Sequence, residues 1–520
     1  MDSPVPKIRA SMMALSSGAL ALGCGMGAPA DETGPSCPAF SYILGDACVP
    51  LPAFADATVA SNADASSPMD EGDAGATETA TPEATRSEAP PVCIYDGASP
   101  VVANAGASGP WIIGTDVSVS DLARDPQGNV FALGSSPTES FFLAKFDPFG
   151  AALWTQTLGD TSEVRPAGIA ADPAGSVVVV GTTVKSSTVT VDFGGGPLPS
   201  GGFVVKYDRD GRLLFQKMFP MADDGSSFPW MSQVRVLASG DIVVAGALQG
   251  TIDFGGGPLT AAGGISVFLA RFGPCGAYVF ARQYGVTADA WSWTHGLAAN
   301  ASELLVTGIF EGSLAFGDGG IEASASTGYD SFVAKFDALG NPIAGRPFHS
   351  DDPNGGPGMP ALDDAGRAIV VGGFTQPIDL GGGVVTPVGS SDAYVAAYGP
   401  NLEYLWALPF GDAAFQTLAA ATLDGAGNVV VTGTLSGGAS LGTWSLQTPD
   451  GGESLLVARL ALDGGVIAAA IATGESSGNA LEAADDTNVL LGGAIQYGPF
   501  QLGGEALDAG PRGMIVKFAP

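Results

Sequence analysis

The chain contains VDFGGGPL at residues 191–198 and a near-copy, IDFGGGPL, at residues 252–259. Three consecutive glycines after a short apolar run are compatible with a loop that binds phosphate. Such a loop is followed by a helix and usually contains a lysine, and the residues after these two stretches predict neither. The near-copy predicts instead that the stretch is one unit of a repeating structure.

Two further patterns recur with the same period. The first is a valine-rich segment that ends in glycine, at residues 129–134, 177–181, 241–246, 303–308, 368–373, 428–433 and 488–493. The second has the form FVAKFD, with a central basic residue in six copies and alanine in the fifth: Lys145, Lys206, Arg271, Lys335, Ala397, Arg459 and Lys517. The steps are about 58 to 65 residues, which is the size of stacked supersecondary units.

Each unit holds four candidate strands joined by tight turns. In the second unit these strands are GIAAD (168–172), VVVVG (177–181), FVVKYD (203–208) and LLFQKMF (213–219). The Asp and Gly residues between them suit short antiparallel hairpins. Seven units of this kind predict an all-β fold, a seven-bladed β-propeller with four-stranded blades. The glycine-rich stretch lies between the second and third strands of a blade.

The last unit lacks a fourth strand because the sequence reaches Pro520 before one. In the other six units a fourth-strand residue lies nine positions after the central one, at Trp154, Phe215, Phe280, Ala344, Trp406 and Ala468. An unpaired strand edge favours aggregation. Residues 109–115 contain PWIIG, which resembles a fourth strand with Trp111 in the place of Trp154. We predict that this segment completes the last blade and closes the ring; the alternative is a linker strand packed outside it.

These motifs resemble the bacterial cell-surface β-propeller repeats known as SBBP repeats, and more loosely the delta-sixty repeats. The shared pattern is GNVVVTG, VDFGGG, FVAKYD and a fourth strand with the LW pair, over about residues 110–520. The resemblance implies an exported or lipid-anchored propeller. It implies no catalytic residues, because the family has no catalytic motif, and a fold alone does not define a function.

Composition agrees with an exported binding protein and argues against a nucleic-acid partner. The 520 residues include 20 Lys and Arg against 53 Asp and Glu, a net charge of −33. Nucleic-acid binding requires a basic surface that neutralises phosphates, so this chain would repel nucleic acid. Only 14% of residues are charged and 77 are glycine, which favours short strands and turns over helices.

The N-terminal region predicts export and a stalk. Residues 1–24 have a basic start, a short apolar run and Ala-Leu-Gly-Cys, which resembles a lipobox with Cys24 as the lipidated residue. The alternative is an ordinary secretory signal. A short cysteine-containing segment (25–50) is followed by a disordered acidic linker (51–92), which has too few large apolar residues to fold. The propeller then spans 93–520. We expect a lipid-anchored protein of the outer membrane or cell surface.

The remaining cysteines are disulfide candidates in an exported chain. Cys37 and Cys48 bracket a short segment and are expected to pair, which leaves Cys93 and Cys275 as the second pair by elimination. No metal site and no cofactor are predicted. Acidic loops can hold Ca²⁺ through oxygen ligands, but no loop has the Asp-x-Asp-x-Asp-Gly calcium pattern.

The sharpest candidate site lies in two segments that flank the fourth blade, read here as loops. They carry the candidate ligand-binding residues Trp291, Trp293, His295, His349, Asp351 and Asp352. The glycine-rich excursions and the inter-blade loops are expected to crowd together on this face. Trp rings can stack on sugars while Asp accepts hydrogen bonds from hydroxyls. A hydrolase or lyase would require the two histidines to meet Asp351 or Asp352 in one pocket. The third reading is that these residues only form ordinary turns and inter-blade packing.

The recurrent Lys or Arg of the third strand has two interpretations. It pairs with a carboxylate of a neighbouring turn or packs its stem between blades, or the cations together form an anion site. Taken together, the sequence predicts a monomeric, non-catalytic binding or scaffolding module whose partner is an unknown protein or polysaccharide of the cell envelope. The alternatives are a carbohydrate-binding, adhesin-like propeller and a propeller hydrolase or lyase.

Overall fold

The computed structural model describes most of the chain from residue 109 onward and two short strands before it. The described residues are 41–44, 47–50 and 109–519, apart from 136–140, 159–163, 184–189, 223–224, 262–263, 286–290, 313, 315, 317–328, 351, 353–354, 486–487, 503, 509 and 511. The predicted signal peptide (1–24) and linker (51–92) lie outside them, as do Cys24, Cys37, Cys93 and Asp351.

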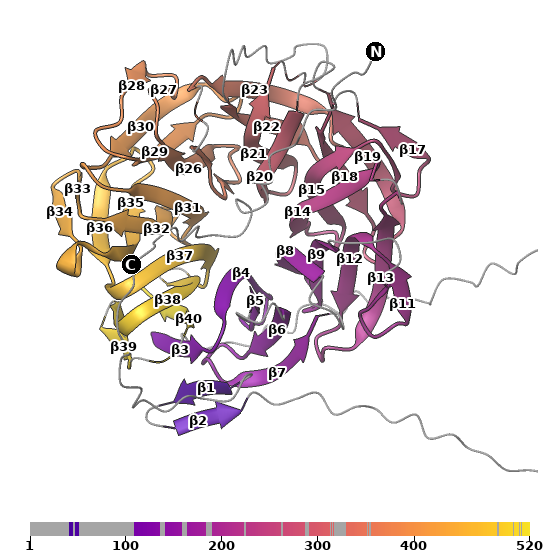
Figure 1. The fold of residues 1–520 in the computed structure, drawn as a ribbon, viewed down its shortest axis with the longest axis horizontal. Coiled ribbons are helices and arrows are strands. Elements are labelled where there is room, and N and C mark those ends of the chain that lie inside the picture. The colour runs from indigo at the N-terminus through magenta and orange to yellow at the C-terminus, as the bar shows by residue number, and fades with distance from the viewer. Residues whose placement is uncertain are drawn as a thin grey trace, which may run out of the picture.

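The described strands form seven antiparallel sheets around one axis (Figure 1), which confirms the seven-bladed β-propeller. From the innermost strand outward, blade 1 consists of β4 (Ser118–Arg124), β5 (Val130–Ser135), β6 (Phe141–Phe146) and β7 (Ala152–Thr157). Blade 2 consists of β8 (Val164–Ala171), β9 (Val177–Thr183), β12 (Gly201–Tyr207) and β13 (Leu213–Pro220). Blade 3 consists of β14 (Phe228–Val236), β15 (Ile242–Gln249), β18 (Ser266–Phe272) and β19 (Tyr278–Tyr284).

Blades 4 to 6 follow in the same order. Blade 4 consists of β20 (Trp291–Ala299), β21 (Glu303–Glu311), β22 (Asp330–Asp337) and β23 (Pro342–Phe348). Blade 5 consists of β24 (Gly356–Pro357) with β25 (Ala361–Leu362), β26 (Ala368–Phe374), β29 (Asp392–Tyr398) and β30 (Tyr404–Phe410). Blade 6 consists of β31 (Gln416–Leu423), β32 (Val429–Ser436), β35 (Glu453–Leu460) and β36 (Val466–Ile471). Among the described residues, no helix is long and apolar enough to cross a bilayer.

The seventh blade is closed by the N-terminal strand, as predicted. It consists of β37 (Thr473–Ala483), β38 (Val489–Leu502), β40 (Gly513–Phe518) and β3 (Trp111–Thr115), and the short β39 (Glu505–Leu507) pairs with β38. Trp111 lies opposite Lys517, in the register in which Trp154 lies opposite Lys145 in blade 1. A hairpin of β1 (Ser41–Leu44) and β2 (Ala47–Pro50) pairs with β3 and extends this sheet outward.

The nine-residue spacing of the sequence is the register of the third and fourth strands. The central residue of the third strand lies opposite the fourth-strand residue in every blade for which the spacing was found: Lys145 and Trp154, Lys206 and Phe215, Arg271 and Phe280, Lys335 and Ala344, Ala397 and Trp406, Arg459 and Ala468. The third strands are buried along their length: in β12, Phe203 and Val205 pack with blade 1, and Val204 packs with blade 3.

The glycine-rich stretches are small hairpins between the second and third strands. They are β10–β11 (Thr190–Asp192, Pro197–Pro199), β16–β17 (Thr251–Asp253, Pro258–Thr260), β27–β28 (Ile378–Asp379, Val384–Val385) and β33–β34 (Gly438–Leu441, Trp444–Gln447). In the first hairpin the Asp192 carboxylate accepts the N–H groups of Gly194 (2.8 Å) and Gly196 (2.9 Å). Both glycines have φ near +100°, a region that side chains disfavour. The motif is therefore a turn with an aspartate cap.

These hairpins meet the inter-blade loops, as expected: the Thr251 N–H donates to Ser227 Oγ, and the Gly438 N–H donates to Asp412 Oδ2. From there they extend to the outer rim of the ring (Figure 1). The middle glycine explains this position: a Cβ on Gly256 would lie 2.1 Å from Cζ of Tyr278 on the outer strand β19, and Gly382 abuts Tyr404 on β30 in the same way. Each hairpin therefore folds back over the fourth strand of its own blade.

A β-bulge interrupts the innermost strand at an equivalent position in six blades. The extra, unpaired residues are Ser120, Ala167, Ser232, His295, Ala419 and Asn479. In blade 5 the innermost strand is divided into β24 and β25 at this level. Bulges of this kind redirect side chains, and here they change the side-chain direction next to the axis.

Candidate functional site

Six basic residues of the third strands are used by the fold. Each forms an ion pair with a carboxylate that follows the first strand of its own blade: Lys145 with Asp125, Lys206 with Asp172, Arg271 with Asp241, Lys335 with Glu303, Arg459 with Asp424, and Lys517 with Asp485. The structure therefore supports the structural interpretation of these cations. Because each charge is already neutralised, they do not form a ring of cations for an anion.

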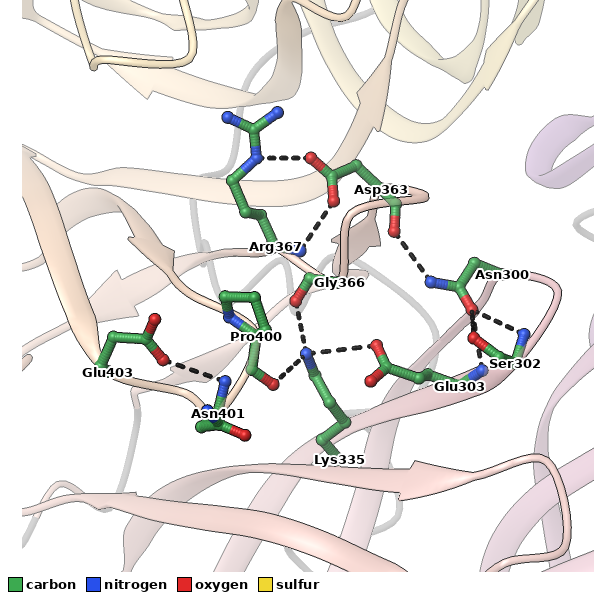
Figure 2. A network of polar contacts seen from close by, with 10 residues as sticks. All are labelled: Asn300, Ser302, Glu303, Lys335, Asp363, Gly366, Arg367, Pro400, Asn401 and Glu403. Atoms are coloured by element: carbon green, nitrogen blue, oxygen red, sulfur yellow. Dashed lines mark hydrogen bonds and ion pairs between the residues drawn. The ribbon is translucent and has the colours of Figure 1, made fainter.

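Four of these cations also reach the neighbouring blade. They donate to carbonyl groups in the turn between its third and fourth strands, on Arg209, Pro274, Ala338 and Pro400. Figure 2 shows one such contact, in which Lys335 Nζ lies 3.3 Å from Glu303 Oε2, 2.7 Å from the Pro400 carbonyl oxygen, and next to the Gly366 carbonyl. We call this arrangement the inter-blade latch.

Blade 5 departs from the latch. Ala397 replaces the cation, and the turn carboxylate of Asp363 pairs instead with Arg367 in its own turn, at 2.6 Å. The indole of Trp406 still donates to the Leu462 carbonyl of blade 6, at 2.8 Å. One contact between blades 5 and 6 is thus kept without the ion pair.

The predicted site residues Trp291, Trp293 and His295 do not lie in a loop. They belong to β20, the innermost strand of blade 4. The prediction of a loop was wrong because burial in this strand alternates opposite to the usual pattern. The small polar Ser292 and Thr294 are buried, and Trp291 and Trp293, which alternate with them, are partly exposed. Thr294 donates to the Gly246 carbonyl of blade 3, at 3.0 Å, which satisfies its buried hydroxyl.

His295 is the unpaired residue of the blade-four bulge. Its Nδ1 lies 3.1 Å from the Pro357 carbonyl oxygen. A carbonyl only accepts, so Nδ1 carries the proton and Nε2 is the free acceptor. Burial lowers the pKa of His295 below its ordinary value, with the Pro357 contact acting in the opposite direction. His295 is therefore a neutral imidazole that links blades 4 and 5.

His349 and Asp352 have separate partners. Nδ1 of His349 lies 3.0 Å from Oδ2 of Asp330, and the imidazole is 56% exposed. Asp352 is buried, and its carboxylate accepts hydrogen bonds from the hydroxyl and N–H of Thr375 and from the Gly355 N–H. Asp351 lies outside the described residues. The two histidines thus engage different groups, and Asp352 stabilises a loop.

The structure instead brings a set of side chains to one edge of blade 4, on the face from which the inter-blade loops leave. We call this set the blade-four edge; it consists of Trp291, Glu311, Tyr329, Asp330 and His349. Trp291 begins β20 opposite Glu311, the last residue of β21. Its ring packs edge-on against Tyr329, with centroids 4.4 Å apart. Asp330 begins β22, and His349 follows β23.

A second group of rings continues from this edge toward blade 3. We call it the aromatic strip; it consists of Phe228, Trp230 and Trp293. The centroids of Phe228 and Trp230 are 4.5 Å apart, and those of Trp230 and Trp293 are 5.0 Å apart. All three rings are partly exposed and lie on β14 and β20, adjacent innermost strands (Figure 1).

The aromatic strip is not required by the repeat. Trp230 and Trp293 lie two residues before the bulge in blades 3 and 4. The residues at this position in blades 1, 2, 6 and 7 are Ser118, Arg165, Thr417 and Ser477. Since four blades fold without an aromatic ring here, the propeller fold does not require a tryptophan at this position.

Sequence reasoning also missed a cluster of charges near the axis. Asp121 on β4 and Glu482 on β37 lie near Arg235 on β14. Burial raises the pKa of Asp121 to about 6 and that of Glu482 to about 7, while Arg235 lowers both. Asp121 also accepts the Ile169 N–H of blade 2, at 3.0 Å. Strands this distant in sequence gave no common motif that would have identified the cluster.

Within the described part of the chain, no group of three or more His, Cys, Asp or Glu is placed to hold a metal ion. Cys275, in the turn between β18 and β19, is disulfide-bonded. Cys48 lies in β2.

No family model matches the chain, and no curated protein matches it. Among solved structures, the chain is similar to a protein of unknown function from Bacteroides caccae, with 12% identity, 56% of this chain and 82% of that chain covered, and a TM-score of 0.26. It is also similar to YCF48 bound to a D1 peptide, with 12% identity, coverage of 79% and 97%, and a TM-score of 0.38. Likenesses this weak carry no argument about function, so the fold rests on the strand pairing described above.

Proposed function

We propose that the chain is a non-catalytic binding or scaffolding module of the cell surface, and that its ligand binds at the aromatic strip and the blade-four edge. The observation that carries the proposal is the set of partly exposed, contacting rings on blades 3 and 4. Exposed aromatic groups gathered in this way are typical of binding surfaces. The recurrent charged residues form ion pairs within the fold, whereas the positions of Trp230 and Trp293 hold no aromatic residue in blades 1, 2, 6 and 7.

The display of the module is part of the same proposal. Cys24 would be lipidated, residues 51–92 would form a stalk, and the propeller would be held outside the outer membrane. The support is the lipobox-like sequence and the resemblance of the repeats to SBBP repeats. A C24S variant that still fractionates with membranes would contradict the anchor.

The enzyme alternative has less support from the geometry. A hydrolase or lyase centre built from the two histidines needs both in one pocket with a carboxylate. His295 instead binds a backbone carbonyl, while His349 binds Asp330. His295 thus links blades 4 and 5, and His349 is part of the blade-four edge.

Retention of envelope material tests the binding proposal. Full-length protein is immobilised and exposed to a solubilised envelope extract, alongside W230A/W293A and the control W444A. Trp444 is 39% exposed but lies on the β33–β34 hairpin of blade 6. We expect wild type and W444A to retain the same component and W230A/W293A to lose it. Equal retention by all three folded proteins would sink the proposal.

A further inference from the structure

We infer that the ligand of the aromatic strip and blade-four edge is a single, uncharged glycan chain. This inference rests on the proposed function and names the chemical class that the site recognises. It is argued from three features of the described residues: the arrangement of the rings, the polar groups beside them, and the charge of the molecule.

The rings suit sugar stacking in a particular form. Pyranose rings have apolar C–H faces that pack on aromatic faces, and tryptophan offers the largest such surface. Here the rings are not coplanar: Phe228 and Trp230 are inclined by 48°, Trp230 and Trp293 by 52°, and Trp291 and Tyr329 by 64°. A flat crystalline polysaccharide would require coplanar rings. Inclined rings fit a flexible chain whose successive sugars turn relative to one another.

The polar groups beside the rings suit hydroxyl ligands. Glu311 lies opposite Trp291, and its carboxylate is close enough to Tyr329 to raise the pKa of that phenol, after the larger effect of burial. A carboxylate accepts hydrogen bonds from sugar hydroxyls. His349 is held by Asp330 through Nδ1, so Nε2 of its half-exposed ring is left for a ligand.

The charge of the site argues against acidic glycans. Glu311 and Asp330 lie at the site, and the whole chain carries a net charge of −33. Anionic sugars would be repelled. The groups of the blade-four edge lie at strand ends: Trp291 and Asp330 begin strands, and Glu311 ends one.

Affinity electrophoresis of the full-length protein tests the inference directly. The probes cast into the gels are glycogen, yeast mannan, alginate, and the neutral and acidic polysaccharide fractions of the producing cell's envelope. We expect retardation by at least one neutral polysaccharide and none by the acidic ones. W291A and W230A should each weaken that binding at least about tenfold, since each removes a stacking surface, while W444A should bind as wild type does. E311Q, which keeps the shape of the side chain, should weaken it less.

The outcomes separate this inference from the proposed function. Retardation by an acidic polysaccharide, or by none of the probes, overturns the glycan assignment. If the envelope component retained in the pull-down resists periodate but is destroyed by protease, the ligand is a protein; the binding module then stands and the glycan inference fails. If W230A/W293A retains envelope material normally, both fail. Near-ultraviolet circular dichroism of each variant shows that loss of binding is not loss of the fold.

Discussion

Lys206 is a cation that the fold keeps almost entirely out of water. Its side chain is 1% exposed and lies 2.7 Å from Asp172, which is fully buried. Removing one member of a buried ion pair leaves the other charge without compensation. Breaking the inter-blade latch should therefore cost more stability than breaking an ion pair at the surface.

We expect K206M to lower the free energy of unfolding by about 3–5 kcal/mol, measured by chemical denaturation. The matched control is R212M, because Arg212 is 68% exposed and pairs with the exposed Asp210 at 3.4 Å and the half-buried Asp208 at 4.0 Å. That variant should change stability by less than about 1 kcal/mol. Equal effects of the two variants would mean that the latch is no stronger than a surface pair.

Glu482 and Asp121 predict that stability decreases as pH rises. Their folded-state pKa values of about 7 and about 6 lie above the ordinary values of 4.5 and 3.8. Between the ordinary and the raised pKa, the folded state binds more protons than the unfolded state. The stabilisation is thus complete below the ordinary pKa and is lost as pH rises through about 6 to 7.

The melting temperature of wild type should therefore fall between about pH 4.5 and about pH 8, and E482Q should flatten part of that fall. E453Q, at an exposed position, is the control. A melting curve of E482Q that depends on pH as steeply as wild type would contradict the role assigned to this carboxyl group.

At the residue scale, the sequence predicted part of the site. Trp291 and His349 were selected from the sequence and lie at the same edge of blade 4. Asp352 was selected for its charge, but its carboxylate caps a loop, which no sequence pattern reports. Glu311 and Tyr329 were missed because their neighbours in space come from other strands of the blade.

At the element scale, the outer hairpins show how a glycine run serves the fold. Gly194 has a φ of +105°, and a Cβ there would meet nothing within 4 Å. G194A consequently isolates backbone strain from crowding. We expect it to lower the free energy of unfolding by about 1–3 kcal/mol, with no measurable change in phosphate affinity.

The control for this substitution is G109A. Gly109 also has open space around it but no positive φ, so the variant should be close to neutral. Denaturation midpoints of the two variants give the comparison. If both variants were neutral, the turn could adopt another conformation without cost.

The strands themselves were predictable because valine-rich segments, tight turns and a constant spacing all agreed. The innermost strand of blade 4 was not. In β20 the buried positions are Ser292 and Thr294, whose hydroxyls bond to blade 3, and the large rings are partly exposed. This inverts the usual apolar-in alternation, so the pattern indicated a loop. The bulges were invisible for a similar reason, because a bulge follows from pairing between strands.

At the scale of the whole molecule, closure by β3 is the contact on which the ring depends. Ile113 is buried, and β3 covers the edge of β40 over residues 111–115. A protein spanning residues 109–520 should remain a folded monomer. One spanning 118–520 exposes the edge of β40 and should melt at a lower temperature and form oligomers, because uncovered edges pair with other chains.

Size-exclusion chromatography and thermal melting of the two truncated proteins give the answer. Identical behaviour would show that β3 packs loosely and that the ring closes without it. The architecture of the whole molecule was predictable because the number of repeats, seven, fixes the number of blades. The site was not, because its rings meet between blades, at contacts that depend on how neighbouring sheets are placed.

The closing strand also sets the order of events when the chain folds. Trp111 pairs with Lys517, more than four hundred positions away in the sequence. Contacts between such distant segments form slowly, since a long loop must close before they contribute. During synthesis, β3 leaves the ribosome among the first described strands and its partner among the last. The complete ring therefore forms only after β40 has been synthesised, and until then β3 has no β40 edge to pair with.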